Sequence, residues 1–221
     1  MTEDIKNIWR NADAVCFDVD STVIQNEAID ELAAFCGKAD QVKAMTIAAM
    51  SGKMEFREAL SQRLRIISPT MKQIQEFIQK HPLRLTKNIK ELVEKLQQKS
   101  IAVYLVSGGF RGIIAPIALE LNIPLQNIYA NKMKFFFNGE YADFDENELT
   151  SKSGGKSLVI QELKNKHHYN KIIMIGDGMT DAEACPPADA FIGFGGNVVR
   201  EEVKSISQWY VHDFQELIDA L

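Results

Sequence analysis

Short apolar blocks alternate with amphipathic stretches along most of this sequence. Four blocks rich in β-branched side chains are predicted as strands, at residues 14–17, 102–106, 172–175 and 190–192. Between them, apolar residues recur every three or four positions, which predicts helices over residues 89–96, 113–121 and 158–163, the first of them capped by Thr86. Strands that alternate with helices predict a parallel sheet, and uninterrupted apolar strands fit a sheet covered on both faces.

Two segments depart from this alternation. Residues 27–81 contain no strand-like block and show only helical periodicity, punctuated by turn signals at Ser68-Pro69-Thr70 and His81-Pro82. We therefore expect a helical subdomain inserted between the first two strands. Residues 132–144 contain an aromatic run, an Asn138-Gly139 turn and a second short apolar stretch. This pattern predicts a β-hairpin, and we expect its run Phe135-Phe136-Phe137 to serve packing.

The composition fits a globular α/β protein. The chain has 221 residues, is 46% hydrophobic and carries a formal charge of −5, which suits one α/β domain plus an insertion. The mild acidic balance argues against nucleic-acid binding, and no apolar run approaches the length that spans a membrane. The three cysteines lack metal-binding spacing and the acidic N-terminus lacks the features of a secretory signal. We therefore expect a cytoplasmic protein whose thiols are reduced, with Cys16 and Cys36 buried.

The first predicted strand runs directly into two aspartates, Asp18 and Asp20, separated by one valine. In an extended strand alternate side chains share a face, so the two carboxylates are expected on the same side. Two anions this close repel, and proteins tolerate that mainly where a cation or a proton lies between them. An isolated Asp-x-Asp is more often the polar turn that ends a strand, so the functional interpretation depends on later motifs.

Three further polar motifs follow in chain order. They are Ser107-Gly108-Gly109 after the second strand, Ser153-Gly154-Gly155-Lys156 at the start of a helix, and Gly176-Asp177-Gly178-Met179-Thr180-Asp181 after the third strand. A small hydroxyl followed by glycines exposes backbone N–H groups that can hold an oxyanion, and a lysine at a helix start favours a phosphate. Each motif is weak by itself, and their order along the chain carries the argument.

This ordered set resembles the motifs of the haloacid dehalogenase-like phosphohydrolases, over about residues 13–194. The resemblance implies a doubly wound (Rossmann-like) parallel sheet with the active site at the carboxyl ends of its strands. It also implies that the helical insertion is a cap that closes over a small substrate. On this basis we expect residues 1–20 and 85–221 to form the core domain and residues 21–84 to form the cap.

The resemblance also implies roles for the motif residues. Asp18 would be the nucleophile that forms an aspartyl-phosphate, and Asp20 would protonate the leaving group and then activate water. The phosphoryl group would be held by Ser107 and the backbone at Gly108 and Gly109, and its charge would be neutralised by Lys156. One Mg²⁺ per subunit would be bound by the Asp18 and Asp177 carboxylates and the Asp20 carbonyl, with Asp181 orienting Lys156 or the metal's ligands.

The substrate is indicated by closer similarity within this family. Segments 16–24, 171–178 and 191–198 resemble those of family members that hydrolyse O-phospho-L-serine to L-serine and phosphate, the last step of serine synthesis. By this resemblance Glu27 holds the amino group, Arg63 holds the carboxylate, and Met50 and Phe56 line the pocket. Charge alone would assign Glu27 and Arg63 to solvated helix faces. The resemblance further implies a homodimer, and Ser51 departs from the family by standing where a glycine is expected.

Two short motifs imitate the signatures of other functions. Gly155-Lys156-Ser157 imitates the end of a nucleotide-binding loop, but Thr150 occupies the place of its first glycine. The glycines at 193–196 imitate a dinucleotide loop, but Val198 occupies the place of the third glycine. A binding module without catalysis would be expected to lack a core carboxylate, and all are present. A relative that acts on another small phosphate monoester remains the open alternative.

Overall fold

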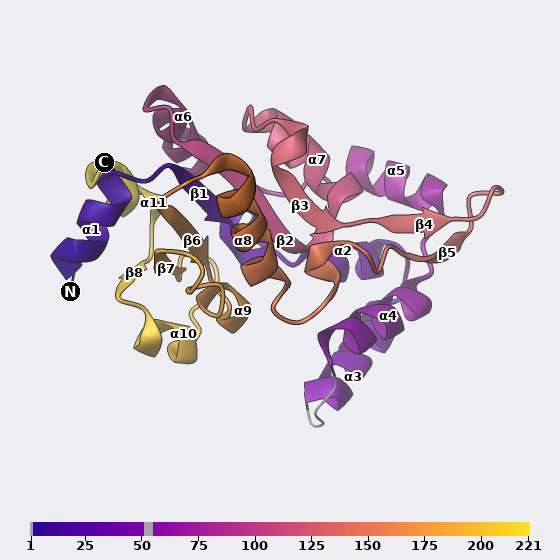
Figure 1. Cartoon of the computed structure of the whole chain (residues 1–221). Helices are drawn as coiled ribbons and strands as arrows, with labels where there is room; N and C mark the ends of the chain where they lie inside the picture. Colours follow the sequence, from indigo (N-terminus) through magenta and orange to yellow (C-terminus); the bar gives the residue numbers. More distant parts are fainter. Residues whose placement is uncertain (1, 51–54) are drawn as a thin grey trace.

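A six-stranded parallel sheet forms the centre of the computed structural model, which describes residues 2–50 and 55–221 (Figure 1). Its strand order is β3-β2-β1-β6-β7-β8. The strands are β1 (Ala14–Phe17), β2 (Ala102–Phe110), β3 (Ile128–Asn131), β6 (Ile172–Gly176), β7 (Ala190–Phe194) and β8 (Trp209–Val211). The chain builds outward from β1 to β3, then returns to the other side of β1 with β6. The order therefore reverses between β1 and β6, where α/β sheets form a crevice for ligands.

Helices cover both faces of this sheet, as the apolar strands predict. The α-helices of the described part are α1 (Thr2–Arg10), α2 (Ala28–Phe35), α3 (Ala39–Met50), α4 (Phe56–Ile67), α5 (Met71–Lys80), α6 (Ile89–Gln98), α7 (Arg111–Glu120), α8 (Gly155–His167), α9 (Met179–Ala182), α10 (Glu201–Ile206) and α11 (Phe214–Asp219), of which α2 to α5 belong to the inserted segment. Val15 and Phe17 belong to a core shared with α1, α6, α7 and α11, whereas Ala14 and Cys16 belong to a core shared with α8 and α10. This alternation is the two-residue period of a strand buried on both sides. None of the helices in the described part is long and apolar enough to cross a bilayer.

The described residues between β1 and α6 contain four helices, α2 to α5, and no strand. Local signals set some of their ends: Thr70 and Gln73 form a capping box at the start of α5. The chain leaves and re-enters the sheet region at adjacent points, where Ile24 and Leu85 form an antiparallel bridge. The side-chain amide of Asn197, from the loop after β7, donates to the Ser21 carbonyl and to the Thr86 hydroxyl, at 3.0 and 2.7 Å. One side-chain amide from the loop after β7 thus bonds to the segment that leaves the sheet region and to the segment that re-enters it.

The predicted strands lie where the apolar blocks are, but most are longer. The predicted bounds of β1 are confirmed, whereas β2 continues from residue 106 to Phe110 because its polar end pairs with β3. Strands β3 and β8, of four and three residues, were not predicted. Thr86 as a helix cap is wrong: Asn88 occupies that position, and the Thr86 hydroxyl instead donates to the Thr22 carbonyl at 2.7 Å.

The predicted hairpin is confirmed as β4 (Met133–Phe135) paired with β5 (Tyr141–Phe144). Its turn contains Gly139 at a φ of 85°, a left-handed conformation that glycine adopts without strain. The packing role expected of the aromatic run is wrong for Phe136 and Phe137, which are exposed, because the strand ends at Phe135 and both lie in the turn. Cys16 is buried as expected, whereas Cys36 is only partly buried.

Candidate active site

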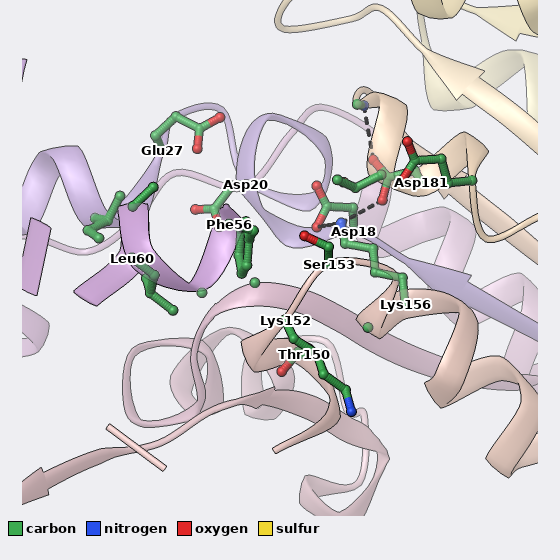
Figure 2. A pocket seen from close by; sticks show the side chains of 18 of the residues that line it. Asp18, Asp20, Glu27, Phe56, Leu60, Thr150, Lys152, Ser153, Lys156 and Asp181 are labelled. Atoms are coloured by element: carbon green, nitrogen blue, oxygen red, sulfur yellow. Dashed lines mark hydrogen bonds and ion pairs between the residues drawn. The ribbon is translucent and has the colours of Figure 1, made fainter. Parts of the chain in front are cut away.

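A cavity of about 640 Å³ lies at the carboxyl ends of β1, β2 and β6, with α4 along one side (Figure 2). Most residues predicted for the site line it: Asp18, Asp20, Glu27, Phe56, Arg63, Gly108, Gly109, Lys156, Asp177 and Asp181. Ser107 lies just behind this wall, and its hydroxyl accepts from the Gly109 N–H at 2.9 Å. Met50 falls outside the residues whose side chains are described. Residues from widely separated motifs therefore surround one cavity.

Asp18 and Asp20 reach this cavity by a different route from the one the sequence predicts. Strand β1 ends at Phe17, and residues Val19–Val23 form a tight turn in which Ser21 has a φ of 54°. The two aspartates therefore do not alternate along a strand. The Asp20 carboxylate accepts from the Ala28 N–H at the start of α2, at 2.7 Å, where the helix dipole favours an anion. Burial and the nearby Glu27 carboxylate raise the pKa of Asp20 to about 7.

Lys156 lies between two buried carboxylates. Its ammonium is 2.7 Å from the Asp18 Oδ1 and 2.5 Å from the Asp181 Oδ1, and its side chain is 11% exposed. Burial alone would lower the pKa of Lys156, but the two carboxylates raise it, so the lysine stays charged. Gly155 fixes its position, because a Cβ there would collide with the Leu149 carbonyl as α8 begins. The lysine is thus held at the first turn of a helix, as predicted.

Asp18, Asp177 and Asp181 form a group of buried acids whose carboxylate oxygens lie within 4.8 Å of one another. Hard divalent cations prefer such oxygen ligands, so the group fits a metal site. Both oxygens of Asp181 already have protein partners, the Lys156 ammonium and the Gly178 N–H at 2.9 Å. Asp18 and Asp177 follow the adjacent strands β1 and β6, and their carboxylates lie on the same side, close enough to bind one ion.

The end of β2 brings backbone N–H groups to the same point. A Cβ at Gly108 would lie 2.9 Å from the Phe56 ring, so the glycine allows α4 to pack directly on this segment. The Gly108 carbonyl accepts from the Asn131 side chain at 2.8 Å, and the Thr150 hydroxyl donates to the same side chain at 3.0 Å. This network fixes the backbone between Ser107 and Gly109, where the Gly109 N–H is already taken by the Ser107 hydroxyl, and Gly108 and Gly109 line the cavity.

Glu27 and Arg63 come from the helical segment. Glu27 accepts from the Ser21 hydroxyl at 2.9 Å, and burial raises the pKa of its carboxyl group. Arg63 lies one and two turns after Leu60 and Phe56 on the face of α4 that lines the cavity. Its Nε is buried and makes no hydrogen bond to the part of the chain that the structure describes. A buried N–H without a hydrogen-bond partner is costly, so this atom is suited to an anionic ligand in the cavity.

Several residues at the site were missed by sequence reasoning. Arg200 donates to the Asp177 Oδ2 at 2.9 Å and lies 3.8 Å from Glu27, although no local motif marks it. Thr180 and Lys152 also line the cavity. Asn131 stands at the carboxyl end of strand β3, the kind of position from which the predicted residues were identified. Recognising that short strand would have identified it.

Comparisons with known proteins agree with this geometry. The model of the haloacid dehalogenase-like hydrolase family matches residues 12–189. The chain is 57% identical to phosphoserine phosphatase of Bos taurus over 218 residues, which are 99% of this chain and 97% of the bovine protein. The structure of DsGPDH of Dunaliella salina matches with a TM-score of 0.88 and 36% identity, over 99% of this chain and 37% of that one. A substrate-bound phosphoserine phosphatase complex shares the fold, with a TM-score of 0.81 and 24% identity over 95% of this chain and 98% of that one.

The contacts of Lys156 predict how stability depends on pH. In Lys156→Met without metal, the Asp18 and Asp181 carboxylates lose their shared counter-charge. Burial already raises both folded-state pKa values, and this loss raises them further. A carboxyl pKa that is raised on folding costs no stability below the unfolded value near pH 4 and destabilises progressively as the pH rises. We expect the variant to lose about 3–5 kcal/mol at pH 8 and much less at pH 5.

Urea unfolding in EDTA at both pH values measures this. Lys164→Met is the matched control, because Lys164 on the same helix pairs with Asp189 near the surface and should cost at most about 1 kcal/mol. An equal loss for Lys156→Met at pH 5 and pH 8 would contradict the prediction.

Proposed function

Because this chain belongs to the haloacid dehalogenase-like hydrolases, we propose that it hydrolyses O-phospho-L-serine to L-serine and phosphate, the last step of L-serine synthesis. Its relatives at 56–57% identity over 99% of the chain are phosphoserine phosphatases. The observation that carries the proposal is a single cavity that combines a paired aspartate site with the unsatisfied Nε of Arg63. The paired aspartates suit a phosphate ester, and the Arg63 guanidinium suits the carboxylate of an amino acid.

The chain's own groups account for the chemistry. In the first step an Asp18 oxygen forms a bond to phosphorus while the bond from phosphorus to the serine oxygen breaks. Asp20 gives its proton to the departing serine alkoxide. In the second step Asp20 takes a proton from water, whose oxygen bonds to phosphorus as the Asp18–phosphorus bond breaks. A carboxyl group with a pKa of about 7 can serve in both directions near neutral pH. Ser107, the Gly108 N–H group and Lys156 hold the phosphoryl oxygens, and Gly109 lines the same end of the cavity.

We propose that the metal is Mg²⁺, one per subunit, bound by the Asp18 and Asp177 carboxylates and by the Asp20 carbonyl. When bound, the ion supplies the positive charge that offsets repulsion between the phosphoryl oxygens and the Asp18 carboxylate. The existing contacts of Asp181 support a role in orienting Lys156, since one of its oxygens accepts from the Lys156 ammonium and the other from the Gly178 N–H.

The helical segment is proposed to recognise the rest of the substrate. Glu27 binds the ammonium group and Arg63 binds the carboxylate, while Phe56 and Met50 line the space between. We also propose that residues 21–84 act as a cap on a core formed by residues 1–20 and 85–221. The adjacent connections at Ile24 and Leu85 support this division, because they join the two parts at one place. A cap that covers the cavity would exclude water from the first step.

We also propose a cytoplasmic location and a homodimeric assembly. Three free cysteines, Cys16, Cys36 and Cys185, support a reducing compartment such as the cytoplasm. A homodimer is proposed from the family resemblance alone.

Phosphate release with Mg²⁺ tests the activity. We expect phosphoserine to be hydrolysed with a higher kcat/KM than phosphothreonine or sugar phosphates, and Asp18→Asn to lower kcat by at least about 10³-fold, because its amide is a poor nucleophile. Asp143→Asn, at an exposed position in the hairpin, is the control and should be unchanged. A sugar phosphate as the best substrate would favour the alternative of another small phosphate monoester, and turnover that survives in Asp18→Asn would remove the nucleophile assignment.

Arg63→Ala tests recognition of the carboxylate. Loss of a charged hydrogen-bonding partner should raise KM for phosphoserine by about 10- to 100-fold. p-Nitrophenyl phosphate has no such carboxylate, so its KM should change little. Arg63→Lys keeps the charge without the forked geometry and should lie between the two. Equal effects on both substrates would contradict the assigned role.

Metal binding can be measured without turnover. At a Mg²⁺ concentration 100 times its Kd, binding to the folded state alone stabilises by about 2.7 kcal/mol. For a chain of this length that corresponds to an increase in Tm of roughly 5–10 °C by differential scanning calorimetry. Asp177→Asn should lose most of this increase, and K⁺ at matched ionic strength should produce none. An undiminished increase in Asp177→Asn would exclude this residue as a ligand.

A further inference from the structure

Helix α4 is attached to the loop that precedes α8 through the side chain of Arg57. Its Nη2 donates to the Ser151 hydroxyl at 3.2 Å and its Nε to the Ser151 carbonyl at 3.4 Å. The same guanidinium reaches the Glu146 carboxylate at 3.3 Å and the Glu146 carbonyl at 3.4 Å. These partners lie 89 and 94 positions later in the sequence. One side chain therefore joins the helical segment to the sheet-bearing part of the molecule at a second place, apart from the connections at Ile24 and Leu85.

The loop that Arg57 contacts is ordered by its own hydrogen bonds. The Ser151 side chain is fully buried, and its hydroxyl donates to the Glu146 carbonyl at 2.9 Å. The Ser151 N–H donates to the Glu148 carbonyl at 3.0 Å. Arg57 thus binds acceptors that are already in place, which limits the entropy lost in forming the contact. The Arg57–Glu146 ion pair is more exposed and contributes less than the bonds to Ser151.

This loop also supports the phosphoryl end of the cavity. Thr150, the neighbour of Ser151, bonds to Asn131, and Asn131 donates to the Gly108 carbonyl. The loop then continues through Gly154 and Gly155 to Lys156. A contact at Ser151 is therefore linked both to the backbone proposed to hold the phosphoryl group and to the lysine that neutralises it.

On the other side, Arg57 belongs to the helix that carries the residues proposed to recognise the substrate. Phe56 packs on Gly108, and Leu60 and Arg63 line the cavity from the same helix. Arg57 itself does not line the cavity, so its guanidinium touches no bound substrate. Its position fixes the distance between Arg63 and the phosphoryl site, because α4 is a rigid unit between the two residues.

We propose that Arg57 is a positioning residue for substrate recognition. Through Ser151 and Glu146 it holds α4 where Arg63 meets the carboxylate of a substrate whose phosphate lies at Ser107–Gly109. This inference rests on the proposed function, and it assigns to Arg57 a contribution that depends on the length and charge of the substrate. A substrate that binds through its phosphate alone does not need α4 at a fixed distance.

Steady-state kinetics of Arg57→Ala test the proposal. We expect kcat/KM for phosphoserine to fall about fivefold to tenfold, mainly through KM, in keeping with the loss of partly exposed charged hydrogen bonds. The value for p-nitrophenyl phosphate should change by less than about twofold. Arg57→Lys keeps the charge but not the fork and should fall between. Arg65→Ala is the matched control: Arg65 is exposed on the same helix, makes no hydrogen bond or ion pair to this loop, and should leave both substrates unaffected.

A double-mutant cycle identifies the partner. Glu146→Ala should cost about twofold to threefold in the native background and nothing further in Arg57→Ala, since the two groups act through one contact. Additive effects would overturn the proposal, as would an Arg57→Ala variant that behaves like Arg65→Ala. An equal loss for p-nitrophenyl phosphate would also overturn it, because that pattern indicates damage to the phosphoryl site.

Amide hydrogen exchange provides a readout that requires no substrate. Arg57→Ala should increase exchange in α4 and in residues 146–151 relative to Arg65→Ala, with the central strands unchanged. If the native protein failed to hydrolyse phosphoserine, the proposed function would be wrong. Hydrogen exchange would still show whether Arg57 holds α4 against residues 146–151. Unchanged exchange in both segments would overturn the role of Arg57.

Discussion

The site depends on one cation placed among acids that would otherwise repel one another. Lys156 contacts Asp18 and Asp181 at the same time, and the burial that makes these contacts strong also makes each lone carboxylate costly. The protein therefore assembles its acids only where a positive charge accompanies them. Lys156 supplies this charge beside Asp18 and Asp181, and Arg200 supplies it beside Asp177. A phosphoryl group enters a pocket whose charges are already arranged for it, so little reorganisation is needed when it reacts.

Sheet topology brings these charges together. Asp18 and Asp177 follow β1 and β6, the adjacent strands between which the chain order reverses. Crossover helices are carried to opposite sides at that point, which leaves the strand ends uncovered. The insertion of α2 to α5 directly after the first aspartates then places a second set of side chains over the opening. Side chains from the strand ends and side chains from the inserted helices therefore line one cavity.

The sequence is sufficient for the parts of this arrangement that depend on local pattern. Asp18, Ser107 and Asp177 were predicted because each follows an apolar block, and strand ends in a parallel sheet share an edge. The turn at Ser21 was not predictable, since its left-handed conformation depends on partners at Asn26 and Glu27. Arg57 and Arg200 were missed because each contacts residues far away in the chain, and a single sequence contains no sign of such pairs. Asn131 was missed because the short strand that it ends was not recognised. Thr86 shows the same limit, because a tertiary partner took the hydroxyl that a local rule assigned to a helix cap.

The adjacent connections of the helical segment also affect how such a protein can diversify. Gln25 and Leu85 are 60 positions apart, yet the side chain of one donates to the carbonyl of the other at 3.0 Å. The inserted segment therefore leaves and re-enters the sheet region at neighbouring positions, as a short loop would. The pairing register of the sheet strands does not depend on how many residues the segment contains. Lengthening, shortening or exchanging these helices can therefore change the side chains over the cavity while the strands keep their pairing. Gene-level recombination at this junction offers a simple path by which one hydrolytic scaffold acquires new substrates.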